Sequence, residues 1–302
     1  MTSVTGQDNA CPICGSASTL IGTKHGRYEA RDFVLRKCPG CRLAFVANPW
    51  TDYPRIYSEE YYAGRGADRL VDYLFELEHP EQTLRRCEWR GIVRAVRSLY
   101  QIDANCRWLD YGCGNGGLVR YVRGQNLCDA VGFEEGWIAA KARQAGIPIL
   151  EAGQLGALAG TFDIVTAIEV LEHVRLPLPV LRQIHSLLKP GGLFFFTTGN
   201  AQPQRNLLAW GYFVPELHIS LFEPATTAFA LAQTGFEVEF RGFIPGFVDI
   251  IRYKALKTVG ITKWKWWHEC MLWPVLSRLL NARLKVSGHP VGWARQGPPA
   301  PQ

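Results

Sequence analysis

The sequence lacks a hydrophobic run that could cross a membrane. Its most apolar stretch, Leu193–Phe196 and its flanks, is far shorter than the roughly 20 residues that a spanning helix needs. The first residues also lack the basic start and apolar core of a secretory signal peptide. With a net charge of only +6, the composition by itself does not argue for nucleic acid as a partner. These absences predict a cytoplasmic protein, in which thiols stay reduced and paired cysteines favour a metal over disulfides.

Two CxxC pairs stand near the N-terminus. They use four of the nine cysteines: Cys11, Cys14, Cys38 and Cys41. Zinc prefers a tetrahedral set of thiolates, and each CxxC turn brings two sulfurs to one side of the metal. The linker between the pairs has room for a short hairpin, with strands predicted at Phe33–Leu35 and Leu43–Phe45. Redox-active or simply buried cysteines are the alternative interpretation. A site closed by four cysteines predicts a structural zinc, not a catalytic one.

Strands and helices alternate from about residue 80 to 245. An amphipathic helix is predicted from Leu84 to Leu99, because apolar residues recur there at helical spacing. The predicted strands are Arg107–Tyr111, Ala130–Glu134, Ile147–Glu151, Phe162–Ile168, Gly192–Thr198 and Phe236–Gly242. This alternation indicates an α/β fold with a mostly parallel sheet covered by helices on both faces.

A glycine-rich turn follows the first of these strands. It holds Gly112, Gly114 and Gly116, and glycines allow a tight turn and a close approach of a ligand to the backbone. The helix that follows presents unpaired amides that favour a negative group. Twenty-two residues after Gly112, at the end of the next strand, Glu134 can accept hydrogen bonds from both ribose hydroxyls of an adenosine. The pattern therefore predicts a nucleoside-binding site.

Asp110 separates two interpretations of this site. A glycine turn with a distal acid also fits a dinucleotide dehydrogenase, but an acid directly before the turn is better placed beside a cationic, zwitterionic ligand than beside a pyrophosphate. Three segments in order, WLDYGCGNGG, FDIVTAIEVLEHV and LLKPGGLFFFTT, resemble the signature blocks of class I S-adenosylmethionine-dependent methyltransferases over about residues 85–242. The resemblance implies a Rossmann-like fold with a seven-stranded sheet and S-adenosylmethionine as cofactor. The CxxC pairs and the connector YSEEYY resemble a subgroup with an N-terminal zinc ribbon, which includes sugar C-methyltransferases of antibiotic pathways.

The resemblance also implies cofactor-binding roles. Asp110, Gly112 and Gly114 would line the methionine end, Glu134 would hold the ribose, Gly153 and Gln154 would flank the adenine, and Ile168 and Glu169 would face the cofactor. His173 matches a position that is histidine in much of the class. It is interpreted as shaping the cofactor pocket, with a catalytic role as the alternative.

Candidate catalytic residues lie on either side of the glycine turn in sequence. In the zinc-ribbon sugar methyltransferases a Glu-His-Ile-x-x-Phe segment carries a catalytic histidine. Here His218 matches it, with Leu217 at the acid's position and Glu216 one residue earlier. The resemblance therefore implies His218 as a general base, with Glu216 as the nearby acid. Tyr61, within the tyrosine-rich connector, would contact the acceptor as part of a lid, or pack as part of a hinge.

The stretch from Arg252 to Pro290 is strongly basic. It holds eight Lys or Arg residues against the single acid Glu269, and five of the ten tryptophans lie in or just beyond it. Apolar residues recur at helical spacing through it: Met271, Leu272, Val275, Leu276, Leu279 and Leu280. The favoured interpretation is a helical cap or a homodimer interface, and the alternative is a helix that rests on an anionic membrane surface.

The sequence thus predicts three parts: a zinc-binding module over residues 1–55, a methyltransferase domain with its connector helix over 56–245, and a basic, tryptophan-rich helical extension over 246–302. The predicted function is methyl transfer from S-adenosylmethionine to oxygen or carbon of a small-molecule or glycan-type acceptor. One alternative is an RNA methyltransferase that grips RNA with the zinc module, but nucleic acid is disfavoured because the linker of that module is only modestly basic. The other is a non-catalytic scaffold that binds the cofactor.

Overall fold

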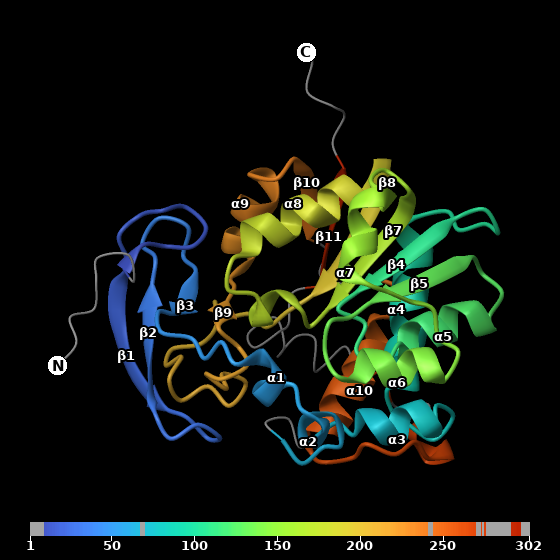
Figure 1. Cartoon of the computed structure of the whole chain (residues 1–302), viewed down its shortest axis with the longest axis horizontal. Helices are drawn as coiled ribbons and strands as arrows, with labels where there is room; N and C mark the ends of the chain where they lie inside the picture. The colour runs from blue at the N-terminus through green and yellow to red at the C-terminus, as the bar shows by residue number, and fades with distance from the viewer. Residues whose placement is uncertain are drawn as a thin grey trace.

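The computed structural model describes residues 9–66, 70–240, 244–269, 273, 275 and 291–296. The described residues form two sheets, a small one built mainly from the N-terminal segment and a large one that carries most of the helices. Figure 1 shows the small sheet beside the large one, with the connector helices below them. Within the described residues, no helix has both the length and the apolar character that crossing a bilayer requires.

The large sheet has seven strands in the order β10-β11-β8-β7-β4-β5-β6. Their bounds are β4 Arg107–Tyr111, β5 Asp129–Phe133, β6 Ile149–Leu150, β7 Phe162–Ile168, β8 Leu188–Thr197, β10 Phe236–Phe240 and β11 Val291–Gln296. The five strands from β8 to β6 run parallel, and β11 is antiparallel to both of its neighbours. The predicted Rossmann-like fold with a mostly parallel, seven-stranded sheet is confirmed.

Strand β11 corrects one prediction. Residues 291–296 were expected to belong to a helical extension, but they form a strand between β8 and β10, with Val291 opposite Thr197. The predicted helix was wrong there because the strand depends on partners more than 50 residues upstream. The sequence VGWARQ has no periodicity that would indicate this pairing. The predicted helix over residues 271–280 lies outside the described residues, apart from Trp273 and Val275, which are helical.

Helices cover both faces of the large sheet. One face packs against α8 Pro177–Leu187 and α9 Pro224–Ala232, and the other against α4 Arg86–Leu99, α5 Gly117–Gly124, α6 Ile138–Gln144 and α10 Phe247–Thr258. The second half of β8 shows why its run of phenylalanines is apolar: Phe194 and Phe196 point into the first core, while Phe195 points into the second. Alternate residues of a strand face opposite sides, so a strand buried on both faces needs no polar positions.

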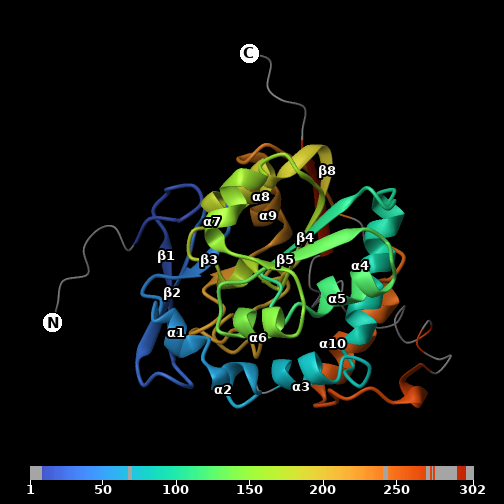
Figure 2. The ribbon, with the colours of Figure 1, turned by 45° about the vertical axis from the view of Figure 1, so that its right-hand side comes forward.

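The connector between the two sheets consists of three short helices, α1 Tyr53–Ile56, α2 Glu59–Tyr62 and α3 Tyr73–Glu78. Figure 2 shows α2 and α3 along the lower side of the molecule, below α6, and α1 higher up, near β2. The side chain of Asn115, in the glycine turn, donates to the backbone oxygen of Tyr73 at 3.0 Å and lies 3.2 Å from a carboxylate oxygen of Glu76. The connector therefore lies against the turn where the nucleoside site was predicted.

The small sheet has the order β1-β2-β3-β9, with β1 Thr19–His25, β2 Asp32–Lys37, β3 Ala44–Val46 and β9 Ser220–Leu221. The strand predicted at Phe33–Leu35 is confirmed within β2, and the one predicted at Leu43–Phe45 overlaps β3, which begins one residue later. β1 and β9 were not predicted, and β9 comes from the loop between β8 and α9. The N-terminal sheet is thus completed by a segment of the large domain.

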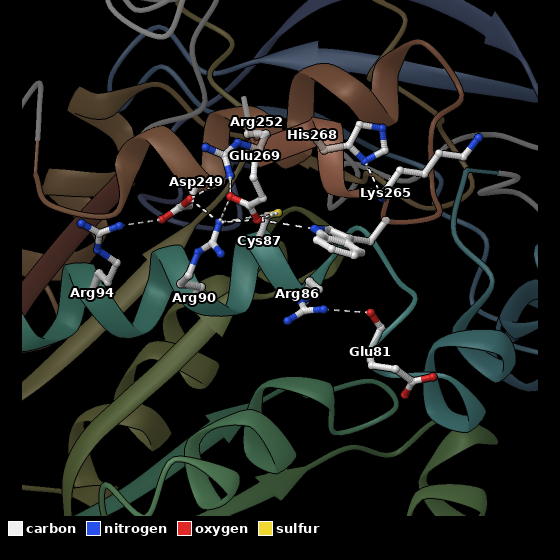
Figure 3. Close-up of polar contacts among 11 residues, drawn as sticks. Glu81, Arg86, Cys87, Arg90, Arg94, Asp249, Arg252, Lys265, His268 and Glu269 are labelled. Carbon is white, nitrogen blue, oxygen red and sulfur yellow. Dashed lines mark hydrogen bonds and ion pairs between the residues drawn. The ribbon is translucent and has the colours of Figure 1, made fainter. Parts of the chain in front are cut away.

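The two helices α4 and α10 pack closely and share a network of charges. Figure 3 shows Arg90 and Arg94 of α4 pointing at Asp249 of α10, with Arg252 and Glu269 beside them. The Asp249 carboxylate lies 2.8 Å from Arg90, 3.1 Å from Arg94 and 3.4 Å from Arg252. Asp249 is buried, so its charge is compensated by these cations more than by water.

We expect the Asp249→Asn variant to lower the free energy of unfolding by about 3 kcal/mol, because it removes the charge that compensates two partly buried guanidinium groups. The measurement is urea unfolding followed by far-UV circular dichroism. Arg94→Ala is the matched control: the Arg94 side chain is 61% exposed, and its loss leaves Asp249 paired with Arg90 and Arg252. This control should cost less than about 1 kcal/mol. Equal losses for the two variants would contradict the assignment of Asp249 as the centre of the network.

Candidate active site

The glycine turn after β4 has the backbone that its sequence predicts. Gly112, Gly114 and Gly116 have φ angles of 72°, 55° and 73°, in the left-handed region that other residues avoid. Space is short as well, since a Cβ on Gly116 would lie 2.7 Å from the side chain of Ile147. The turn is fixed to the end of β5 by the amide of Gly112, which donates to the oxygen of Phe133 at 2.8 Å. Only glycine therefore fits at these three positions of the turn.

Asp110 is the second-last residue of β4, close to the turn, and is buried. Its carboxylate accepts a hydrogen bond of 2.7 Å from the hydroxyl of Thr166 on β7. Burial raises the pKa of Asp110 to about 7, and the neighbouring carboxylates of Glu134 and Glu88 act in the same direction. A buried acid of this kind favours a cation as its partner, which is what the sequence predicted for this position.

Glu134 lies where the end of β5 meets the turn. Its two carboxylate oxygens accept hydrogen bonds from the amides of Gly114 at 2.9 Å and Gly136 at 2.7 Å. Burial raises the pKa of Glu134, while these amides lower it. A carboxylate held in this way has lone pairs that suit ligand hydroxyls. Asp110, the glycine turn and Glu134 thus lie next to one another where β4 and β5 end.

The residues predicted beside the adenine lie on helix α7 Ala152–Leu155. The Gln154 side chain accepts a hydrogen bond of 2.8 Å from the amide of Glu151, and Glu151 in turn caps the first amides of the helix. Gly153 is exposed, and a Cβ built there meets nothing within 4 Å. The structure thus gives Gln154 a capping role and leaves the Gly153 edge of the helix open.

A pair of acids follows β7. Ile168 ends the strand, and Glu169 has a φ of 55°, which is unusual for a residue other than glycine and marks a strained position. The Glu169 carboxylate accepts from the hydroxyl of Thr197 at 2.8 Å and of Tyr212 at 3.2 Å. Glu172 is buried and also accepts from the Tyr212 hydroxyl. Burial, followed by repulsion from Glu169, raises the pKa of Glu172 to about 8. Burial and the nearby Glu169 carboxylate therefore both favour the protonated form of Glu172.

Lys254 reaches this pair from α10. Its ammonium group lies 3.3 Å from the Glu169 carboxylate and 3.1 Å from that of Glu88. Burial opposes the charge of Lys254, but the two carboxylates prevail and raise its pKa. A residue of the basic C-terminal stretch is thus part of the site, and no sequence pattern connected it with Glu169.

Two histidines face each other next to the acids. The rings of His173 and His218 lie 4.9 Å apart, and the His218 ring stacks on Tyr212 at 4.2 Å. Nδ1 of His218 bonds to the backbone oxygen of Tyr212. Since a carbonyl oxygen only accepts, Nδ1 carries a proton, and Nε2 is the nitrogen that can take up another. One ligand-type atom each of Glu172, His173 and His218 lies within 4.8 Å of the others, a spacing compatible with a metal ion.

The tyrosines of the connector form an aromatic cluster against this site. Tyr61 is buried and packs edge-on against Tyr57 at 5.1 Å and Tyr62 at 5.0 Å. The hydroxyl of Tyr57 lies 3.0 Å from Nδ1 of His173. Tyr61 thus packs within the cluster, and Tyr57 connects the cluster to the histidines.

Glu216 is close to His218 in sequence but points elsewhere. Its carboxylate accepts a hydrogen bond of 2.9 Å from the amide of Tyr28, in the β1–β2 hairpin. Residues 214–218 form a turn, in which the amide of His218 donates to the oxygen of Val214 at 2.8 Å, so neighbouring side chains diverge. The structure therefore brings together His218, His173 and Glu172, and it places Glu216 against the N-terminal module.

The four predicted metal ligands do come together. Sγ of Cys11 lies 3.4 Å from that of Cys41, and Sγ of Cys14 lies 3.3 Å from that of Cys38. All four sulfur atoms lie within 4.8 Å of one another. Backbone amides point at the sulfurs, for example that of Cys41 at Cys38 at 3.4 Å. The donor set and its spacing fit a tetrahedral metal site.

Comparisons with known proteins agree with this geometry. The family profile described as a methyltransferase domain matches residues 60–239. The ubiquinone biosynthesis O-methyltransferase of Pseudomonas aeruginosa (strain UCBPP-PA14) is 37% identical over 111 residues, which are 33% of this chain and 47% of the relative. That of Ruegeria pomeroyi is 34% identical over 146 residues, 43% of this chain and 58% of the relative. The chain thus spans about half the length of these curated relatives.

Among solved structures, a chain of the complex that contains the Haloferax volcanii Trm112 methyltransferase activator matches with a TM-score of 0.51 at 15% identity, over 80% of this chain and 98% of the other. An S-adenosylmethionine-dependent methyltransferase from Mesorhizobium loti matches with a TM-score of 0.48 at 20% identity, over 69% of this chain and 99% of the other. At these identities the first likeness supports the fold alone.

Proposed function

This chain belongs to the methyltransferase domain family and is an S-adenosylmethionine-dependent methyltransferase, and from that premise we propose that it methylates a hydroxyl oxygen of a small-molecule acceptor. Relatives named ubiquinone biosynthesis O-methyltransferase support oxygen as the methylated atom. The resemblance to zinc-ribbon sugar C-methyltransferases favours a glycan-type acceptor, which also carries hydroxyl groups, and for such an acceptor carbon is the alternative methylated atom.

The observation that carries the proposal is the position of His218 beside His173 and Glu172. When bound, the cofactor supplies a methyl group on a positively charged sulfur. A hydroxyl oxygen becomes a better nucleophile as its proton is removed, so an oxygen acceptor requires a nearby base. Nε2 of His218 would take this proton, with Nδ1 oriented by the backbone oxygen of Tyr212. Asp110, the glycine turn and Glu134 would hold the cofactor, with Gly153 and Gln154 near the adenine and Ile168 and Glu169 facing the cofactor from the end of β7.

The roles of the remaining candidates follow from their contacts. Tyr57 would orient His173 through the hydrogen bond between them, and Tyr61 would support Tyr57 by packing. Glu216 would act on the reaction only through the loop that carries His218. Lys254 would keep Glu169 ionised next to Tyr212.

The test is methyl transfer from S-adenosylmethionine labelled in the methyl group into three fractions of cell extract. One fraction holds water-soluble metabolites, including sugars and sugar nucleotides, the second holds lipid-extractable compounds, and the third holds RNA and protein. We expect label in a product of low molecular mass, present as a methyl ether by its NMR chemical shift. A labelled methyl on carbon would overturn oxygen as the acceptor atom, and label confined to RNA or protein would overturn the small-molecule proposal.

We also propose that the four cysteines hold one structural zinc ion. Four thiolates leave no position for a substrate, so the ion would stabilise the module without taking part in the reaction. We expect about one zinc per chain by elemental analysis of the purified protein. The Cys38→Ser variant should bring the zinc content to near zero, while Cys128→Ser, at a cysteine outside the cluster, should leave it unchanged. Full zinc content in Cys38→Ser would contradict the assignment.

A last proposal concerns the segment after α10, in a protein that we place in the cytoplasm. Trp266 is 79% exposed and Trp267 46% exposed, next to the exposed lysines Lys263 and Lys265. Tryptophan and lysine together favour an anionic membrane surface. Flotation with anionic phospholipid vesicles tests membrane binding by this segment. Equal flotation of the wild type and of Trp266→Ala/Trp267→Ala contradicts membrane binding. The homodimer interface predicted for the same segment is then tested by light scattering.

A further inference from the structure

The loop between β8 and α9, residues 199–223, carries both Tyr212 and His218 and is here called the acceptor loop. Its last residues join the N-terminal sheet as β9, where Phe45 lies opposite Ser220 and Ala44 opposite Leu221. The amide of Val46 donates to the oxygen of Ile219 at 2.9 Å. The backbone next to His218 is therefore part of the sheet of the four-cysteine module.

The same residues are also fixed to the catalytic side. The amide of Ile219 donates to the oxygen of Glu172 at 2.8 Å, and the hydroxyl of Ser220 donates to the oxygen of Val174 at 2.7 Å. Ile219 thus forms one backbone bond to the module and one to the segment that carries Glu172 and His173. These two bonds determine the position of His218 relative to those residues.

Glu223 connects the end of the acceptor loop with the second cysteine pair. Its side chain is only 2% exposed, and its carboxylate lies 2.6 Å from Nζ of Lys37 and 2.6 Å from Nε of Arg42. Lys37 directly precedes Cys38, and Arg42 directly follows Cys41. Arg42 has a φ of 68°, so the turn around the cysteines holds it in a conformation that it would not adopt alone. The partners of this buried carboxylate are thus in place only when the cysteine turn is formed.

Apolar packing joins the rest of the acceptor loop to the module. One buried cluster combines module residues with loop residues: Phe33, Leu35, Ala44 and Val46 with Ala201, Leu207, Phe213, Ile219 and Leu221. The ammonium group of Lys24 donates to the oxygen of Phe213 at 2.6 Å. By contrast, Asp110 and Glu134 make their hydrogen bonds within the large domain, to Thr166, Gly114 and Gly136.

We propose that the four-cysteine module positions the acceptor loop, and that Glu223 is a positioning residue that links the second cysteine pair to His218. The module thus acts on methyl transfer and not on cofactor binding. This inference rests on the proposed role of the acceptor loop in methyl transfer. The four-cysteine module would then contribute to turnover by positioning the loop, without any contact between metal and substrate.

The test compares four full-length variants, the fourth being Glu223→Asp, at a temperature at which all remain folded. Glu223→Gln removes the charge that Lys37 and Arg42 bind, and Arg42→Ala removes one partner and leaves the other. Asp163→Asn is the matched control, because Asp163 is a buried acid that pairs with Lys189 at 2.7 Å at the opposite ends of the strands. We measure kcat, the Kd for S-adenosylmethionine, and hydrogen exchange of residues 212–221.

For Glu223→Gln we expect kcat to fall about tenfold or more, with a Kd for the cofactor within about twofold of the wild type. Amides of residues 212–221 should exchange faster, and Arg42→Ala should show a smaller change of the same kind. Asp163→Asn should leave kcat and these amides unchanged. Glu223→Asp, which keeps the charge, should restore part of the lost turnover.

Unchanged exchange and kcat in Glu223→Gln would overturn the proposal, as would a loss of cofactor affinity that matches the loss of kcat. Hydrogen exchange needs no acceptor. Faster exchange in Glu223→Gln therefore supports the link between module and loop even if the acceptor is not a hydroxyl compound. Failure of the proposed oxygen methylation is recognised separately by the labelled-methyl test.

Discussion

Replacing His218 with alanine should lower kcat by about 100-fold or more, because a positioned general base contributes roughly that factor to proton removal. The Kd for S-adenosylmethionine should stay within about twofold of the wild type, since Asp110 and Glu134 make their contacts in the large domain. The measurement is steady-state turnover with the acceptor found by methyl labelling, together with calorimetry for the cofactor.

His185→Ala is the control for the His218 experiment. His185 lies on α8, where its ring packs against Phe236 at 5.0 Å, away from the acids and from Tyr212. Its loss should leave kcat unchanged. A His218→Ala enzyme that binds the cofactor normally and retains full turnover would show that the acceptor needs no base at this position, and the acid pair Glu169 and Glu172 would then be the groups to replace.

The fold was largely predictable because its signals are local. The strands buried on both faces appear as short apolar runs, and the turn after β4 requires glycine at Gly112 and Gly116 for reasons of φ angle and space. The two CxxC pairs predicted the sulfur cluster in the same way. Strands β9 and β11 were missed, because their residues have no partner nearby in the sequence and are strands only through pairing with distant edges.

The active site was predictable only where residues follow one another along a motif. Tyr212 bonds to Glu169 and Glu172 from about 40 positions away, and Lys254 reaches Glu169 from α10, so neither could be inferred from spacing. Glu216 shows the opposite error. Its nearness to His218 in sequence suggested a shared role, but the turn between them sends its carboxylate to Tyr28.

The affinity for S-adenosylmethionine should depend on pH through Asp110. Burial raises the pKa of this acid to about 7, so below that pH the folded protein without cofactor holds it protonated. A cationic ligand favours the ionised form, and the proton must therefore leave when the cofactor binds. The Kd should rise about tenfold for each pH unit below about 7 and level off above it. Titration calorimetry in buffers from about pH 5 to about pH 8 measures this directly.

Two variants separate the charge of Asp110 from its surroundings. Asp110→Asn should weaken cofactor binding by about 10- to 100-fold at neutral pH and remove the pH dependence, because the amide carries no charge to release. Thr166→Val removes the hydroxyl that donates to the carboxylate at 2.7 Å and so stabilises its ionised form. It should therefore move the midpoint of the pH dependence upward and keep its slope. A wild-type Kd that stays constant across this range would mean that the cofactor's charge is compensated elsewhere, with Glu134 as the next acid to replace.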